Sequence, residues 1–128
     1  MPPPFWIRSL GGRGEYWARR YLHRRGYHLL ARNWRSGKAE LDLAMANAQR
    51  VLFVEVKTRR KRHQRRLADL IHPRQEQRLT RIADQFLRQY PVSEIPWQFV
   101  LIEVVPQSLL RVEIRMSRLT SAESYLKL

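Results

Sequence analysis

One hairpin decides the fold of this chain, and it lies in residues 39–57, AELDLAMANAQRVLFVEVK. Residues 39–46 and 51–57 each have the composition of a β-strand, and the short segment 47–50 between them predicts a tight connection. The second strand is apolar almost throughout, which is typical of a strand buried in the middle of a sheet. The sequence therefore predicts a hairpin with one strand at the centre of the sheet.

Four charged side chains of this hairpin form two pairs, each with a spacing of two residues. Side chains alternate between the faces of a strand, so both members of a pair project to the same side. On the first strand we expect Leu41 and Leu43 together on the face opposite the charged pair. The two charged pairs are Glu40 with Asp42, and Glu55 with Lys57.

The rest of the chain predicts further strands and two helices, and hence an α/β or α+β fold with a mixed sheet of about five strands flanked by helices. Residues 1–13, rich in proline and glycine, predict a flexible N-terminal arm, and residues 14–128 a single domain. A short helix is expected after Arg118. The expected elements are helices from Gly14 to about Arg25 and from Pro73 to about Tyr90, and strands over 27–34, 39–46, 51–57, 97–105 and 110–116.

The composition points to a polyanionic partner. The 128 residues carry a formal net charge of +14, which favours binding to DNA or RNA. The chain has no cysteine, which excludes disulfides and thiolate metal sites. Neither a signal peptide nor a membrane-spanning run is evident, so we expect a cytoplasmic protein with no membrane partner.

The two charged pairs have the composition of a phosphodiesterase metal site. Such a site needs oxygen ligands for a hard cation such as Mg²⁺ or Mn²⁺, a group that orients or deprotonates water, and positive charge for the transition state. Asp42 and Glu55 are the natural ligands, and the backbone carbonyl of Val56 is placed to join them. Lys57 can reach the attacking water or the scissile phosphate. Glu40 can either coordinate through water or pair with an arginine.

A salt-bridge network is the competing interpretation, because the surplus arginines could neutralise the carboxylates. Ionised residues at the end of so apolar a strand are costly unless they are partnered, which favours the metal site, but spacing alone does not decide. Glu15, at the start of the first helix, either complements the helix dipole or serves as an outer metal ligand. The histidines lack the spacing of zinc ligands.

An arginine-rich run after the hairpin is the candidate contact with a nucleic-acid backbone, which would make binding dependent on salt and indifferent to sequence. Two arginines of the following helix extend this basic surface. The residues concerned are Arg59, Arg60, Lys61, Arg62, Arg65, Arg66, Arg74 and Arg78.

Several motifs occur in a fixed order along most of the chain, from Gly14 to Val105. They are Gly14-Glu15, Ala18, Tyr21-Leu22, Gly26-Tyr27, Arg32-Asn33-Trp34-Arg35, Glu40-Leu41-Asp42-Leu43, and Phe53-Val54-Glu55-Val56-Lys57-Thr58-Arg59-Arg60. In order and spacing they resemble the bacterial YraN family, which is described as endonuclease-like.

That resemblance implies the restriction-endonuclease-like fold of the PD-(D/E)xK superfamily, which includes Holliday-junction resolvases. On this pattern Asp42 is the hairpin aspartate, Glu55 and Lys57 are the (D/E)xK pair, and Glu15 is the acidic residue of the first helix. The implied activity is metal-dependent hydrolysis of DNA, including structured or branched DNA. Analogy with junction-cutting members of the superfamily also implies a homodimer.

The chain departs from the family pattern at several positions. Ala39 stands where glycine is usual, and Val100 where an aspartate often follows phenylalanine. Residues 64–68 replace a common phenylalanine-glycine stretch. Gln75 stands where a lysine is common, and it offers a phosphate a hydrogen bond without a charge. The expected metal ligands are intact.

Because a fold does not establish a function, the sequence leaves two main hypotheses open. One is a magnesium-dependent nuclease, and the other is a nucleic-acid-binding accessory protein that keeps the nuclease fold without cutting. A third, a basic protein on an RNA-rich assembly, fits the charge but gives the carboxylates no role.

Overall fold

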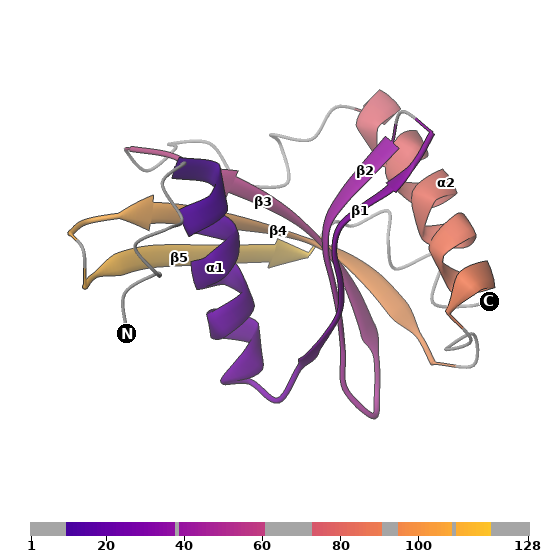
Figure 1. The fold of residues 1–128 in the computed structure, drawn as a ribbon, viewed down its shortest axis with the longest axis horizontal. Coiled ribbons are helices and arrows are strands. Elements are labelled where there is room, and N and C mark those ends of the chain that lie inside the picture. Colours follow the sequence, from indigo (N-terminus) through magenta and orange to yellow (C-terminus); the bar gives the residue numbers. More distant parts are fainter. Residues whose placement is uncertain (1–9, 38, 61–72, 91–94, 109, 119–128) are drawn as a thin grey trace.

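The computed structural model describes residues 10–37, 39–60, 73–90, 95–108 and 110–118. These residues form a five-stranded sheet with two helices (Figure 1). The elements in chain order are α1 (Leu10–His23), β1 (His28–Ser36), β2 (Ala39–Ala46), β3 (Val51–Thr58), α2 (Pro73–Gln89), β4 (Trp97–Pro106) and β5 (Val112–Arg118).

The strands lie side by side in the order β1-β2-β3-β4-β5, so β1 and β5 form the two edges of the sheet. Neighbouring strands are antiparallel except β3 and β4, which are parallel. Parallel strands need a long crossover, and the connection from β3 to β4 contains α2. The expected α+β class with a mixed sheet is confirmed, and it agrees with the restriction-endonuclease-like fold that the resemblance implies.

Helix α1 covers one face of the sheet, called here the α1 face. Ala18 and Leu22 are fully buried against apolar side chains of the three central strands. The helix ends where the sequence predicts, because Gly26 has a φ of 91°, which favours glycine. The Tyr27 N–H then donates to the Leu22 carbonyl at 3.1 Å, which satisfies one of the free carbonyls at the helix end.

Helix α2 covers the opposite face, called here the α2 face. Its buried side chains pack on Phe53, whose ring centroid lies 5.5 Å from Phe86, 5.6 Å from Trp97 and 5.7 Å from Phe99. The four residues at the start of β3 are buried, with side chains in the clusters of both faces. This confirms the predicted position of β3 at the centre of the sheet. The buried residues of α2 are Leu79, Ile82, Ala83 and Phe86, as the helical spacing predicts.

Some boundaries differ from those expected. The first helix begins at Leu10 instead of Gly14, so residues 10–13, which the sequence analysis assigned to an N-terminal arm, are helical. The prediction placed the helix start too late because Gly11 and Gly12 each disfavour a helix by about 1 kcal/mol. Strand β5 begins at Val112 instead of Leu110, whose side chain is exposed. The remainder of the expected arm and the helix expected after Arg118 lie outside the described residues.

None of the helices in the described ranges is both long and apolar enough to span a membrane.

Candidate functional site

The candidate site lies where β2 and β3 separate. Their ladder runs from the pair Ala46 and Val51 to the pair Leu43 and Val54 and stops there. Beyond it, the Val56 N–H donates a hydrogen bond of 2.8 Å to Asp42 Oδ2. The Asp42 carboxylate therefore occupies the place that a backbone carbonyl would take in a continued ladder.

An irregularity in β1 turns Asp42 toward α1. Asn33 has a φ of 51°, which is uncommon outside glycine, and it lies between the residues paired with Leu41 and Leu43. Leu41 packs in the α2-face cluster, whereas Leu43 packs in the α1-face cluster. The expectation that the two leucines share a face is therefore wrong, because strict alternation fails at this point. As a result Asp42 interacts electrostatically with Glu15 of α1.

A glycine brings α1 close enough for that interaction. Gly14 is buried, and a Cβ atom at this position would lie 1.8 Å from Oγ1 of Thr58 and 2.9 Å from its Cβ. Only a residue without a side chain allows the helix to approach the end of β3 this closely. Glu15, the next residue, is thereby held over the gap between β2 and β3. Because α1 begins at Leu10, Glu15 lies beyond its first turn, so the alternative role as a complement to the helix dipole is not seen. Its role as an outer metal ligand stays a prediction.

Three carboxyl groups interact in the gap, and the pKa of each is raised. Burial is the largest cause for all three. For Glu15 the negative charge of Asp42 adds to the effect, while a hydrogen bond from Asn33 opposes it. For Glu55 the charge of Asp42 adds to burial, and the pKa rises to about 7.

Asp42 and Glu55 are in direct contact through a hydrogen bond, which lowers the pKa of Asp42 and raises that of Glu55. Those opposite effects mean that a protonated Glu55 donates to an ionised Asp42. The two groups therefore titrate as a pair, and Glu55 is the member that holds its proton to higher pH, because burial and the charge of Asp42 raise its pKa. A pair of adjacent carboxylates that resists double ionisation is well suited to bind a cation, which would replace that proton.

Lys57 is the nearest cation to this pair. Its Nζ lies 3.2 Å from Oε1 of Glu55, whose side chain is only 15% exposed. This is the ion pair that the competing salt-bridge interpretation expects, but it neutralises only one of the carboxylates. Glu40 instead forms an exposed contact of 3.8 Å with Arg35 across β1 and β2, which is the second role proposed for it. Glu40 still acts on Asp42 through its charge.

Glu103 is a further carboxylate beside Lys57 that the sequence analysis did not identify. It is fully buried in β4, directly opposite Lys57 in the parallel register. Arg115 of β5 donates to its Oε1 from two nitrogen atoms, at 2.9 and 2.7 Å. Its Oε2 is buried and has no hydrogen-bond partner among the described residues. The sequence does not reveal this carboxylate as part of a pair, because Glu103 is the only charged residue of an apolar strand and its partner Arg115 lies on another strand.

The described residues hold no group of three or more acidic or histidine side chains arranged to bind a metal ion. The donor set therefore consists of two carboxylates in contact, with Glu15 engaged by Asn33. Mg²⁺ commonly binds through one or two carboxylates and keeps several waters, so Asp42 and Glu55 fit this ion. The oxygen-only donors disfavour a softer metal such as zinc.

The expected nucleic-acid contacts are only partly described. Arg59 is half-buried and Arg60 is exposed just beyond β3, while Arg78 is exposed on α2. The backbone of Arg74 and Gln75 lies in α2, but their side chains are outside the described set. The other members of the basic run, Lys61, Arg62, Arg65 and Arg66, lie outside the described residues.

Sequence reasoning gave no role to Asn33, Thr58 or the close approach of Gly14, although all three stand in the motifs that carry the family resemblance. An asparagine inside a strand is a weak signal for a positive φ, because asparagine tolerates that conformation better than most residues. The contact between Gly14 and Thr58 joins distant parts of the chain, so no local pattern reveals it.

Comparison with known proteins places the chain in a family. The family model described as "Uncharacterised protein family UPF0102" matches residues 14–115. The chain belongs to this family. It is the YraN family of the sequence analysis, so that resemblance is confirmed. The matched range begins at Gly14 and contains every carboxylate described above.

Individual relatives carry the same family name. The chain is similar to a "UPF0102 protein" of Roseiflexus castenholzii, 38% identical over 96 residues, which covers 74% of this chain and 77% of the relative. A relative from Mycolicibacterium vanbaalenii is 40% identical over 97 residues, covering 76% and 78%. One from Synechococcus is 36% identical over 110 residues, covering 83% and 84%. These names state a family and no activity.

Proposed function

We propose that this UPF0102 protein is a divalent-metal-dependent nuclease that hydrolyses phosphodiester bonds in DNA. The observation that carries the proposal is the direct contact of Asp42 and Glu55 beside Lys57, in the gap between β2 and β3. Burial raises the pKa of both carboxyl groups, and the charge of Asp42 raises that of Glu55 further. Buried carboxylates of this kind cost stability, and they are typical of functional sites. The family resemblance assigns the same three residues to the same site.

The metal ion would be held by Asp42 and Glu55. When bound there, a divalent cation would polarise the phosphate and offset the charge that develops in the transition state. Glu15 would assist through water, because its carboxylate faces Asp42 without touching Glu55 in any described contact. A cation held by these residues would compete with the proton of Glu55, so its binding should weaken as pH falls.

Lys57 would act on the water or on the phosphate. Its side chain is one-third exposed, and its Nζ lies 3.2 Å from Oε1 of Glu55. From this position it can donate a hydrogen bond to the attacking water or to a non-bridging phosphate oxygen, and its charge stabilises the developing anion. Its ion pair with Glu55 fixes the ammonium before substrate binds, so less side-chain entropy remains to be lost.

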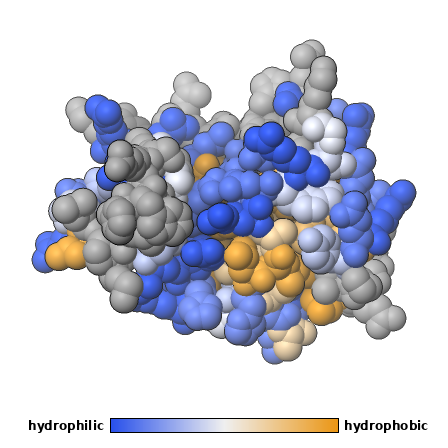
Figure 2. Space-filling view, viewed as in Figure 1, coloured by the Kyte–Doolittle hydropathy of each residue, from blue (hydrophilic) through white to orange (hydrophobic). Residues whose placement is uncertain are grey.

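The basic character of the chain supports a polyanionic substrate. Arg59 follows the last residue of β3, two residues beyond Lys57, and its buried Nε has no hydrogen-bond partner among the described residues. Seen from the side of α1, hydrophilic residues cover most of the described surface (Figure 2). With a formal net charge of +14, this surface should attract the nucleic-acid backbone strongly at low salt.

The proposal is tested by incubating linear, nicked and branched DNA with the full chain in Mg²⁺ or Mn²⁺. The variants are Asp42→Asn and Lys57→Ala, and Asp84→Asn is the matched control, since Asp84 is exposed on α2 and paired with Arg88. We expect wild type and the control to cut, and both site variants to lose at least about 100-fold in rate. Metal-dependent cleavage that both site variants retain would refute the assignment.

A second function, DNA binding without cleavage, is favoured by two features of the site. Lys57 already pairs with Glu55, and no three-ligand group occurs among the described residues. Calorimetric titration with Mn²⁺ separates the two functions. Binding heat that disappears in Asp42→Asn supports the nuclease, whereas salt-sensitive DNA binding with no Mn²⁺ heat and no cleavage of any substrate supports the accessory protein.

A further inference from the structure

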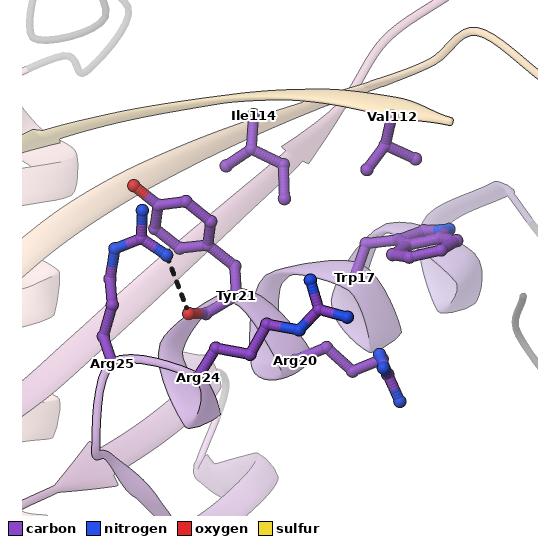
Figure 3. A pocket seen from close by; sticks show the side chains of 7 residues that line it. All are labelled: Trp17, Arg20, Tyr21, Arg24, Arg25, Val112 and Ile114. Carbon is purple, nitrogen blue, oxygen red and sulfur yellow. Dashed lines mark hydrogen bonds between the residues drawn. The ribbon is translucent and has the colours of Figure 1, made fainter. Parts of the chain in front are cut away.

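A groove lies on the α1 face between α1 and the edge strand β5, away from the carboxylate cluster. It encloses a volume of about 310 Å³. In Figure 3, Trp17 and Tyr21 extend from α1 toward Val112 and Ile114, whose side chains project from β5 toward the helix. The groove is therefore bounded by a helix on one side and the sheet edge on the other.

The walls of the groove are aromatic and aliphatic. Trp17, Tyr21, Val112 and Ile114 are each partly exposed, although all four also pack against the buried cluster of the α1 face. Their exposed surfaces face the same space. Aromatic rings paired with aliphatic side chains form a slot that suits a flat ring with two apolar faces.

The rim of the groove is cationic. Arg20, Arg24 and Arg25 line it, and none of its lining residues is acidic. Arg25 is fixed in place, because its guanidinium lies 3.5 Å from the centre of the Tyr21 ring and donates to the Tyr21 carbonyl at 3.2 Å. Arg20 is half-buried, and its Nη1 donates to the Tyr16 hydroxyl at 3.4 Å. Arg24 is exposed, and Figure 3 shows it reaching along α1 toward the space below Trp17.

Part of this basic rim complements the helix dipole, since Arg20 lies in the last turn of α1. The dipole does not explain why aromatic walls stand beside the arginines. A ligand that satisfies both features has a flat apolar ring and an anionic group close to it. A nucleotide unit of a polynucleotide has this composition, with a base for the slot and a phosphate for the arginines.

We propose that the groove between α1 and β5 binds an unpaired segment of single-stranded DNA, with one base between the aromatic walls and its phosphates on Arg20 and Arg24. A base in a duplex is stacked and paired, so only an unpaired base can enter the slot. The volume suits one nucleotide, because it falls at the lower end of the range for small-ligand sites, about 300–1,000 Å³.

The position of the groove links it to the carboxylate cluster. Tyr21 follows Glu15 by six residues on the same helix, which corresponds to about 9 Å along the helix axis. Six residues also turn the side-chain direction by about 120° around the helix, so a strand that leaves the cluster would have to pass partly around α1 to enter the groove. The choice of DNA rests on the proposed function, but binding in the groove does not require cleavage.

The test measures binding without catalysis. The full chain is titrated into a labelled twelve-nucleotide oligo(dT), and binding is followed by fluorescence anisotropy. The buffer contains EDTA, which removes divalent metal ions, so the measured affinity does not depend on whether the protein is a nuclease. The groove variants are Arg24→Ala and Trp17→Leu, and Arg81→Ala is the matched control, because it removes the same charge from the exposed surface of α2. Circular dichroism verifies that each variant is folded.

We expect both groove variants to bind oligo(dT) about tenfold more weakly than wild type, with Arg81→Ala close to wild type. Arg24→Ala should also reduce the slope of log K against log salt by about 0.7, the value for one phosphate contact on a single strand. Wild type should bind oligo(dT) about tenfold more tightly than an abasic strand of equal length, and Trp17→Leu should lose that preference. A blunt duplex should bind wild type and both groove variants equally.

Several outcomes would overturn the proposal. Groove variants that bind oligo(dT) as Arg81→Ala does would show that the arginines and the tryptophan make no contact with it. Equal affinity of wild type for oligo(dT) and the abasic strand would show that no base binds between the aromatic walls. Tighter binding of oligo(rU) would reassign the ligand to RNA. A dimer, detected by sedimentation velocity, that dissociates in Trp17→Leu would assign the groove to a second copy of the chain.

Discussion

Replacing Gly14 by alanine is the sharpest test of how α1 is held over the site. Alanine is the better helix former by about 1 kcal/mol, so local propensity alone predicts a more stable protein. The added Cβ would, however, lie 1.8 Å from Oγ1 and 2.9 Å from Cβ of Thr58. Rotation of the Thr58 side chain relieves the first contact but leaves the second, because the Cβ atom does not move with that rotation.

The helix must therefore move away from β3. Overpacking of this kind costs about 1–3 kcal/mol and sometimes more, and a contact this short belongs at the upper end. After subtraction of the gain in helix propensity, we expect Gly14→Ala to lower the free energy of unfolding by about 1–2 kcal/mol. Urea denaturation followed by circular dichroism measures this change.

A second substitution isolates the contact. Thr58→Gly removes the side chain that Gly14→Ala would meet, so the double variant should show a favourable coupling of about 1–3 kcal/mol in a double-mutant cycle. Gly26→Ala is the control, since its cost comes from a φ of 91° with nothing within 4 Å, and it should not couple to Thr58→Gly. A Gly14→Ala protein as stable as wild type, or a coupling near zero, would refute this account of the helix position.

Three further perturbations test other parts of the structure. Arg115→Met leaves the buried Glu103 carboxylate without its partner, so the free energy of unfolding, measured in urea, should fall by about 3–5 kcal/mol. Adding Glu103→Leu should recover most of this loss. A loss under about 1 kcal/mol would contradict a buried charge at Glu103. Burial and the charge of Asp42 raise the pKa of Glu55 from 4.5 to about 7, so the folded state holds this proton more tightly than the unfolded state. Without metal, the free energy of unfolding should therefore fall by up to about 3 kcal/mol as pH rises from about 4.5 to about 7. Urea unfolding at about pH 5 and about pH 8 measures this fall, which should be smaller in Glu55→Gln. Phe53→Ala removes the ring that contacts three other aromatic rings, so it should lower the free energy of unfolding by about 3–5 kcal/mol. A loss below about 1 kcal/mol would show that the surrounding side chains move in to fill the cavity.

The central strand and the two covered faces could be predicted from local patterns. The apolar run that begins at Val51 has no polar alternation, so it had to be buried on both faces. The stripe that includes Ile82 and Phe86 has helical spacing, so the face of α2 that meets the sheet followed from it. These signals are local, because each depends on residues that are close in sequence.

The geometry of the site was less predictable because it depends on contacts between distant segments. Alternation placed Leu41 with Leu43, but the two side chains pack on opposite faces, at the point where Asn33 of the neighbouring strand has a positive φ. The burial of Glu103 depends on Arg115 of β5, which the spacing within β4 does not reveal. The residue types of the proposed metal site were readable from sequence, but the contact between its two carboxyl groups required their positions in space.

The single parallel pairing in the sheet has a consequence for the order of folding. Strands β1, β2 and β3 are joined by short connections, as are β4 and β5, whereas β3 and β4 meet only after the long crossover that contains α2. Short loops close at a lower entropic cost, so we expect the three-stranded meander and the β4–β5 hairpin to form first and to dock later. Asp42 and Glu55 come together within the meander, while Lys57 and Glu103 become neighbours only at docking. The carboxylate pair should thus be assembled before the surroundings of its lysine are complete.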